Sequence, residues 1–141
     1  MFPSPCFRIE EVIVSPLTFA GVGKTVIAAF DYKRFKQANK RARLLFVAHR
    51  KEILEQSIQT FREILNDFNF GELYVDGRKP TEIEHLFISI QFFNSAKLAQ
   101  WTSTDYYDYI CVDEFHHAAA NSYQELLSYY HPKILLGLTA T

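Results

Sequence analysis

Cysteine is scarce in this sequence, with only Cys6 and Cys111 among 141 residues. Two cysteines that lie far apart in the chain provide neither a disulfide framework nor a zinc-binding cluster. Cys111 lies within an apolar run, which predicts a buried, reduced thiol. The sequence also lacks an internal repeat, a low-complexity tract and a linker. We therefore expect a single domain with one core, which suits a chain of this length.

An excess of one charge and long apolar runs are lacking as well. The 15 basic and 16 acidic residues nearly cancel, so any nucleic-acid-binding surface must be local. No apolar run approaches the roughly 20 residues that cross a bilayer, and the N-terminal sequence MFPSPCFRIEE does not have the pattern of a signal peptide. Hydrophobic residues make up 48% of the chain, which is typical of globular proteins. We expect a soluble, cytoplasmic protein with no membrane partner.

Short apolar runs alternate with stretches of helical periodicity. The runs are Val12–Val14, Leu44–Ala48, Leu73–Val75, Leu86–Ile90, Tyr109–Val112 and Ile134–Leu136. Runs this short, rich in β-branched and aromatic residues, indicate buried strands. The stretches between them have the spacing of amphipathic helices. This alternation predicts an α/β fold over residues 1–141, a three-layer sandwich with a mostly parallel sheet covered on both faces.

A glycine-rich segment follows the first expected strand and opens a helix expected over residues 26–35. Small residues let backbone N–H groups surround an anion, and the helix N-terminus adds positive potential. Lys24 would reach the β- and γ-phosphates, and the Thr25 hydroxyl would bind Mg²⁺. The pattern G-x-x-x-x-G-K-[ST] has glycine where this chain has Thr18, and an ordinary helix N-terminus is the alternative. The candidate phosphate-binding residues are Gly21, Val22, Gly23, Lys24 and Thr25.

An acidic pair, Asp113 and Glu114, follows directly on a buried apolar run. Two carboxylates at the end of a buried strand are costly unless a positive charge lies nearby. Mg²⁺ bound together with a triphosphate would supply that charge. Asp113 would hold the metal through its water shell, and Glu114 would polarise the attacking water. The alternative is a solvated loop that begins after a strand. With Lys24, these residues are the candidate catalytic set.

Four short motifs together resemble those of helicases. Asp113–His116 resembles the DExH form of motif II, and Gly137–Thr141 resembles motif III. Phe46–Arg50 resembles motif Ia, and Ser89–Gln91 resembles a stretch that follows a later strand. They occur in the expected order over almost the whole chain. The chain resembles the first RecA-like, ATP-binding domain of superfamily two DEAD/DEAH-box helicases, and within them the subunits of type III restriction enzymes.

The resemblance implies ATP and Mg²⁺ as cofactors and nucleic acid as a partner, with DNA favoured and RNA left as the alternative. His49, Arg50 and Gln91 would contact the sugar-phosphate backbone of the nucleic acid. Arginine is well suited to such contacts. Coupling between the ATP site and nucleic acid would come from His116, Thr139, Ala140 and Thr141. The alternatives are a helix-initiating surface pair for His49 and Arg50, a solvated loop for His116, and a plain strand end for Thr139 and Thr141.

The sequence also departs from the family pattern. The short N-terminal segment has no glutamine-bearing helix to read adenine, and Ala20 and Val22 stand where threonines are common. The second RecA-like domain, with its arginine finger, is absent from residues 1–141, and we expect it to be supplied in cis or in trans. The implied function is an ATP-dependent helicase or translocase domain that is nearly inactive alone. A non-catalytic remnant or interaction module is the alternative, while a small kinase is disfavoured by the T-A-T ending.

Overall fold

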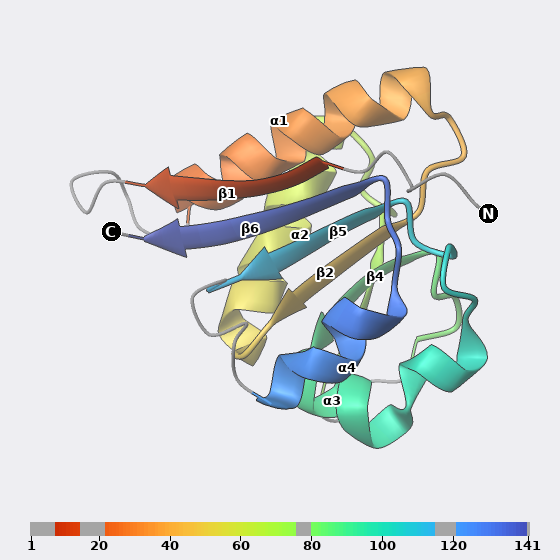
Figure 1. The fold of residues 1–141 in the computed structure, drawn as a ribbon. Helices are drawn as coiled ribbons and strands as arrows, with labels where there is room; N and C mark the ends of the chain where they lie inside the picture. Colours follow the sequence, from red (N-terminus) through yellow and green to blue (C-terminus); the bar gives the residue numbers. More distant parts are fainter. Residues whose placement is uncertain (1–7, 15–21, 76–79, 115–120, 141) are drawn as a thin grey trace.

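The structure is a computed structural model that describes residues 8–14, 22–75, 80–114 and 121–140, with the backbone alone described for residues 8–14, 22, 139 and 140. Strands and helices alternate along these residues, except that β4 follows β3 directly and a 3₁₀ helix follows α3 (Figure 1). In chain order the elements are β1 (Arg8–Val14), α1 (Val22–Ala38), β2 (Leu44–Ala48), α2 (Lys51–Leu65), β3 (Glu72–Tyr74), β4 (His85–Ser89), α3 (Ile90–Ala96), the 3₁₀ helix η1 (Leu98–Trp101), β5 (Tyr109–Asp113), α4 (Asn121–Tyr129) and β6 (Ile134–Ala140).

The strands form one sheet in the order β1-β6-β5-β2-β4-β3, and every pair of neighbours is parallel. All strands therefore end at the same edge of the sheet. Because β5 and β6 lie between β1 and β2, the end of β5 has the ends of β2 and β6 on either side. Ligands of open α/β sheets bind outside this carboxyl edge. The topology thus predicts where a site would lie before any side chain is considered.

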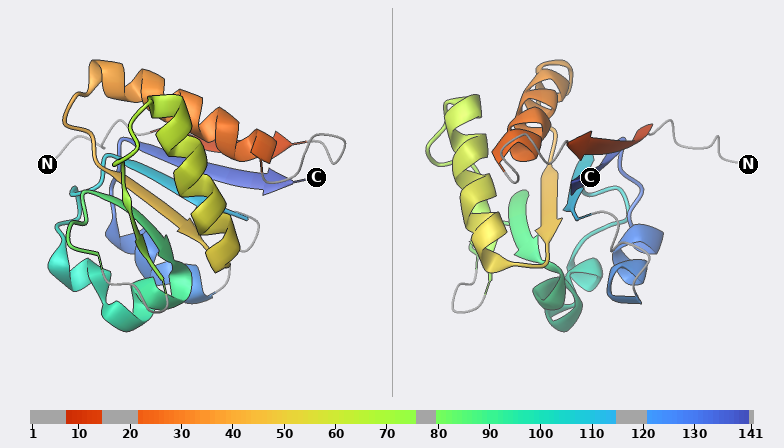
Figure 2. Two further views of the ribbon diagram at one scale, coloured as in Figure 1. Left: turned by 180° about the vertical axis from the view of Figure 1, so that it is seen from behind. Right: turned by 90° about the vertical axis from the view of Figure 1, so that its left-hand side faces the viewer.

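Helices cover both faces of the sheet, with α1 and α2 on one face and α3 and α4 on the other (Figures 1 and 2). Successive side chains of a strand point to opposite faces, and in β2 Leu44 and Phe46 pack beneath α1 and α2. Leu45 and Val47 pack in the second core, beneath α3 and α4. The predicted three-layer α/β sandwich is confirmed. In the described part of the chain, no helix combines the length and apolar character of a membrane span.

The structure corrects several predicted element bounds. Strand β2 has the predicted bounds, but β1 starts at Arg8 and β6 runs to Ala140, because the two strands pair in register along their whole length. The hydrogen bonds between neighbouring strands need only backbone groups. Strand pairing can therefore continue through polar residues, at which an apolar run in the sequence ends. Ile90 begins α3 instead of ending β4, since the Ser89 side chain caps that helix by accepting a hydrogen bond from the Phe92 N–H at 3.2 Å.

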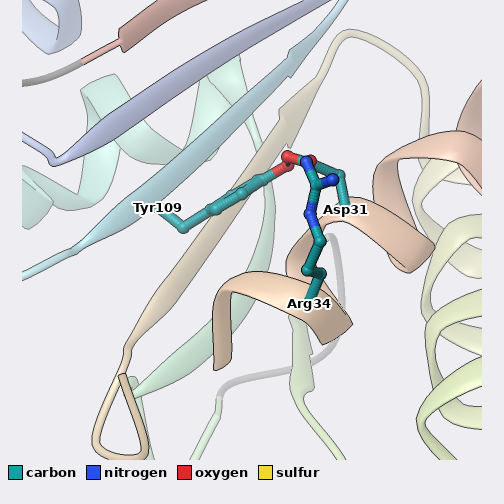
Figure 3. Close-up of polar contacts among 3 residues, drawn as sticks. All are labelled: Asp31, Arg34 and Tyr109. Atoms are coloured by element: carbon teal, nitrogen blue, oxygen red, sulfur yellow. Dashed lines mark hydrogen bonds and ion pairs between the residues drawn. The ribbon is translucent and has the colours of Figure 1, made fainter. Parts of the chain in front are cut away.

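A polar network fastens α1 to the start of β5 (Figure 3). The Tyr109 hydroxyl donates to Oδ2 of Asp31 at 2.7 Å, and Nη2 of Arg34 donates to Oδ1 of the same carboxylate at 2.9 Å. Hydrogen bonds to charged groups are stronger than neutral ones. The network therefore fixes α1 relative to β5, and these two elements carry the residues predicted to bind phosphate and Mg²⁺.

The thiol of Cys111, in the middle of β5, is buried and free. Burial, reinforced by the negative charge of Asp113, raises its pKa well above the usual value. The thiol is therefore neutral, and the predicted reduced, buried cysteine is confirmed.

Candidate nucleotide site

Lys24 and Asp113 meet at the carboxyl edge of the sheet. Lys24 lies in the first turn of α1, and Asp113 is the last residue of β5. Nζ of Lys24 is 2.5 Å from Oδ1 of Asp113, and the two side chains are only 8% and 1% exposed. Desolvating such a pair is costly, and removing one partner would leave the other charge buried alone. Two residues that lie far apart in sequence are thus brought into contact.

Both carboxylate oxygens of Asp113 are buried without a hydrogen bond to the described residues. The contact with Lys24 is an ion pair by distance, but it lacks the angles of a hydrogen bond. Buried polar atoms in proteins are nearly always hydrogen-bonded, so two unsatisfied oxygens need an explanation. Water molecules in the shell of a bound Mg²⁺ ion would donate hydrogen bonds to them. The carboxylate therefore fits the predicted role of Asp113.

Thr25, the second candidate ligand of Mg²⁺, is buried next to Lys24 in the first turn of α1. A hydroxyl and a carboxylate are hard oxygen ligands, which suit Mg²⁺, and this ion usually completes its shell with water and substrate phosphate. Within the described ranges, no group of three or more His, Cys, Asp or Glu side chains is placed to hold a metal. Thr25 and Asp113 supply two such oxygen ligands, which fits an ion that shares its shell with a phosphate.

The start of α1 suits an anion. Helix α1 begins at Val22, so the predicted start at Val26 was wrong, and Gly23 lies with Lys24 in the first helical turn. That turn carries no acidic residue, so the positive potential of its first N–H groups is not neutralised from within the helix. Such an N-terminus favours phosphate binding. Gly21 lies outside the described residues, and its predicted role is not tested.

Glu114 contacts Arg50, which the sequence predicts to bind nucleic acid. The backbone of Glu114 is in the left-handed region, with φ of 56°, a conformation that non-glycine residues rarely adopt. Its Oε1 lies 3.6 Å from Nη2 of Arg50, and the Glu114 and Arg50 side chains are 25% and 66% exposed. Arg50 is the N-cap residue of α2, at the end of the β2–α2 connection. Sequence reasoning missed this contact, because no local pattern reports it.

His49 and Tyr123 pack beside the acidic pair. Their rings make an edge contact, with centroids 5.6 Å apart and planes at 67°. Tyr123 of α4 is fully buried, and its hydroxyl has no hydrogen-bond partner in the described structure. Burial, together with the charges of Glu114 and Asp113, raises the pKa of Tyr123 above its usual value. The helical spacing of Tyr123 indicates only packing, so its position near the site was not predictable from sequence.

The remaining candidates lie at the same edge or outside the described residues. Gln91 is exposed in the first turn of α3, directly after β4. Thr139 and Ala140 are the last residues of β6. His116 and Thr141 lie outside the described ranges, so their predicted roles are not tested. The described candidates therefore gather at the carboxyl edge, and the ion pairs among them are Lys24–Asp113 and Arg50–Glu114.

The fold is that of a RecA-like domain, and the described candidate residues lie at the carboxyl edge of its sheet. Residues 13–141 match the family described as type III restriction enzyme, res subunit, and the chain belongs to this family. No curated protein sequence matches the chain.

Two of the solved structures that share the fold are helicase structures. The helicase domain of Hef from Pyrococcus furiosus is 24% identical with a TM-score of 0.69, over 94% of this chain and 30% of that one. The UvsW helicase from bacteriophage T4 is 13% identical with a TM-score of 0.67, over 95% of this chain and 46% of that one. The chain therefore spans less than half the length of either.

Proposed function

We propose that the chain is the ATP- and Mg²⁺-binding domain of a DNA helicase or translocase. The observation that carries the proposal is the buried Lys24–Asp113 pair, whose carboxylate oxygens have no hydrogen-bond partner in the described structure. Burying two charges is costly, and so is burying Oδ2 of Asp113 with neither a hydrogen bond nor an ion pair in the described structure. ATP with Mg²⁺ supplies the partners for both residues.

Each residue of the site has a distinct task in this proposal. Lys24 binds the phosphates as a point charge, and the first N–H groups of α1 add hydrogen bonds to the same oxygens. Thr25 and Asp113 hold Mg²⁺, which when bound neutralises phosphate charge. Glu114 orients and polarises the attacking water. Phosphoryl transfer depends mainly on such positioning and charge stabilisation.

Nucleic acid would bind across the same edge of the sheet. His49, Arg50 and Gln91 follow β2 and β4, and their side chains suit phosphate and sugar contacts, which do not read sequence. His116 and the segment Thr139–Thr141 would couple this surface to the ATP site. With few phosphate contacts, binding is expected to be weak and to fall with rising salt.

A second RecA-like domain, in cis or in trans, would complete the helicase and its ATPase site. In related NTPases an arginine finger increases the rate by roughly 10³ to 10⁵. We therefore expect residues 1–141 alone to bind ATP but to hydrolyse it slowly. Unwinding also requires two domains that close around the nucleic-acid strand. ATP can do mechanical work only by shifting the balance between an open and a closed arrangement of such domains.

The test is a calorimetric titration of the 141-residue chain with ATP in the presence of Mg²⁺. Lys24→Ala should weaken binding by at least about tenfold, since hydrogen bonds to charged groups contribute roughly 1.5–3 kcal/mol. Lys33→Ala, which removes an exposed lysine of the same helix, should leave the affinity unchanged.

Lys24→Ala also leaves the Asp113 charge buried alone, which can destabilise the fold. The double variant Lys24→Met/Asp113→Asn removes both charges and should remain folded, yet bind no ATP. Binding at the parental affinity by either folded variant would refute this ATP site. A parent chain that binds no MgATP would favour a non-catalytic module over the proposed ATPase.

A further inference from the structure

We propose that Arg50 is shared between Glu114 and the nucleic-acid backbone, so that a bound strand releases Glu114 for catalysis. Without nucleic acid, Arg50 holds the Glu114 carboxylate. A strand phosphate takes the guanidinium, and the carboxylate is then able to orient water. This inference rests on the proposed function, because it concerns how the same site is regulated.

The backbone of Arg50 is fixed while its side chain is not needed for the helix. As the N-cap residue of α2 it has extended backbone angles, φ −110° and ψ 137°, and its side chain makes no capping hydrogen bond. Its carbonyl accepts a hydrogen bond from the Leu54 N–H at 3.3 Å. The long side chain, 66% exposed, can therefore exchange partners without disturbing α2.

On the other side of the pair, Glu114 is anchored through its neighbour in the chain. Glu114 follows Asp113, whose ion pair with Lys24 ties the end of β5 to α1. Its carboxylate is one-quarter exposed, and among the described residues Arg50 is the cation within ion-pair distance. The guanidinium thus lies 3.6 Å from one of the two oxygens with which Glu114 would accept a hydrogen bond from water.

The strength of this contact suits a switch. Charge-assisted hydrogen bonds are about 2.7–2.9 Å long, whereas this pair is separated by 3.6 Å. A long, solvent-exposed pair is weak. A backbone phosphate can bind the guanidinium through two parallel hydrogen bonds, so it can displace the carboxylate. Arg50 is therefore a positioning residue, which affects the reaction through Glu114.

Competition for one guanidinium changes the affinity for nucleic acid, which can be measured without ATP hydrolysis. If Glu114 competes with nucleic acid for Arg50, then Glu114→Gln must strengthen nucleic-acid binding, and only when Arg50 is present. The measurement is fluorescence anisotropy with a labelled, mixed-sequence single-stranded DNA at low salt and without nucleotide. Four chains are compared: the parent, Glu114→Gln, Arg50→Ala and the double variant.

We expect Glu114→Gln to raise the affinity about two- to fivefold in the parent, the range for a weak exposed pair. In the Arg50→Ala background the same change should have little effect. Arg50→Ala itself should weaken binding. Thermal unfolding of each chain checks that the fold is retained.

Two neighbouring variants are matched controls. Glu52→Gln removes an acidic charge from the first turn of α2, so it reports the effect of general repulsion of DNA by a carboxylate. Lys51→Ala removes an exposed cation next to Arg50. It should weaken binding without changing the response to Glu114→Gln.

Three results would overturn the proposal. These are an equal effect of Glu114→Gln in both backgrounds, an effect no larger than that of Glu52→Gln, and no DNA binding by any chain. The proposed ATP site is tested separately, because MgATP binding and its loss in Lys24→Ala are measured without DNA. A chain that binds MgATP but shows no coupling between Arg50 and Glu114 would retain the proposed function and lose the switch.

Discussion

The two carboxylates of the acidic pair differ because their surroundings differ. Asp113 is 1% exposed and paired with Lys24, whereas Glu114 is 25% exposed and loosely paired with Arg50. A buried, fixed carboxylate suits a structural task such as holding a metal shell. A partly exposed one can reach water and change partners. Adjacent carboxylates often acquire separate roles in this way, through environment more than through sequence.

Tyr123 allows a test of the buried polar atoms near this pair. Its hydroxyl has no hydrogen-bond partner in the described structure, and a buried unsatisfied group costs roughly 1–3 kcal/mol. We therefore expect Tyr123→Phe to leave the free energy of unfolding unchanged or to raise it by about 1 kcal/mol. The ring and its contact with His49 are retained. Urea denaturation measures the change.

Tyr107→Phe is the matched control for this prediction. Tyr107 packs in the same core, but its hydroxyl donates to the carbonyl of Ile83 at 2.7 Å. Its loss should lower the free energy of unfolding by about 0.5–1.5 kcal/mol. If Tyr123→Phe is as destabilising as Tyr107→Phe, the Tyr123 hydroxyl makes a stabilising hydrogen bond in the folded protein, and the prediction is wrong.

At the scale of elements, the centre of the fold was predictable and its ends were not. Strands buried on both faces must be apolar throughout, so β2 could be predicted with its bounds. The outer parts of β1 and β6 are held by backbone pairing, which has no side-chain signature. The start of α1 at Val22 was missed because glycine in a first helical turn looks like a loop.

The connection between α2 and β3 offers a prediction for one element junction. Gly71 has φ of +75°, and a Cβ there would lie 2.9 Å from Cε1 of the buried Phe87. A left-handed alanine costs roughly 1–2 kcal/mol, and overpacking adds to this cost. We expect Gly71→Ala to lower the free energy of unfolding by about 2–3 kcal/mol in urea denaturation.

Asn66, the C-cap residue of α2, provides the comparison. It also adopts a left-handed conformation, with φ of 55°, so Asn66→Gly should be neutral or slightly stabilising. If both substitutions were neutral, the left-handed turn and close packing at Gly71 would not contribute to stability.

At the scale of the whole molecule, the sequence predicted that the candidates which the structure describes lie at the carboxyl edge of the sheet, but not which of them are in contact. The ends of parallel strands meet at one edge, so motifs that follow different strands must gather there. Contacts such as Arg50–Glu114 depend on where β2 and β5 lie in the sheet, which the order of motifs does not specify. The roles of these residues in ATP and nucleic-acid binding stay predictions.

If Lys24 and Asp113 form a site for phosphate and Mg²⁺, the affinity of the chain for ATP must depend on Mg²⁺. The affinity of the parent chain and of Asp113→Asn for ATP is measured by calorimetry, once with Mg²⁺ and once with EDTA. The parent should bind ATP at least about tenfold more tightly with Mg²⁺, because Asp113 accepts charge-assisted hydrogen bonds from the metal's water shell. Asp113→Asn should lose most of this difference. Equal affinity of the parent with and without Mg²⁺, or a full Mg²⁺ effect in Asp113→Asn, would show that Asp113 does not hold Mg²⁺ at this site.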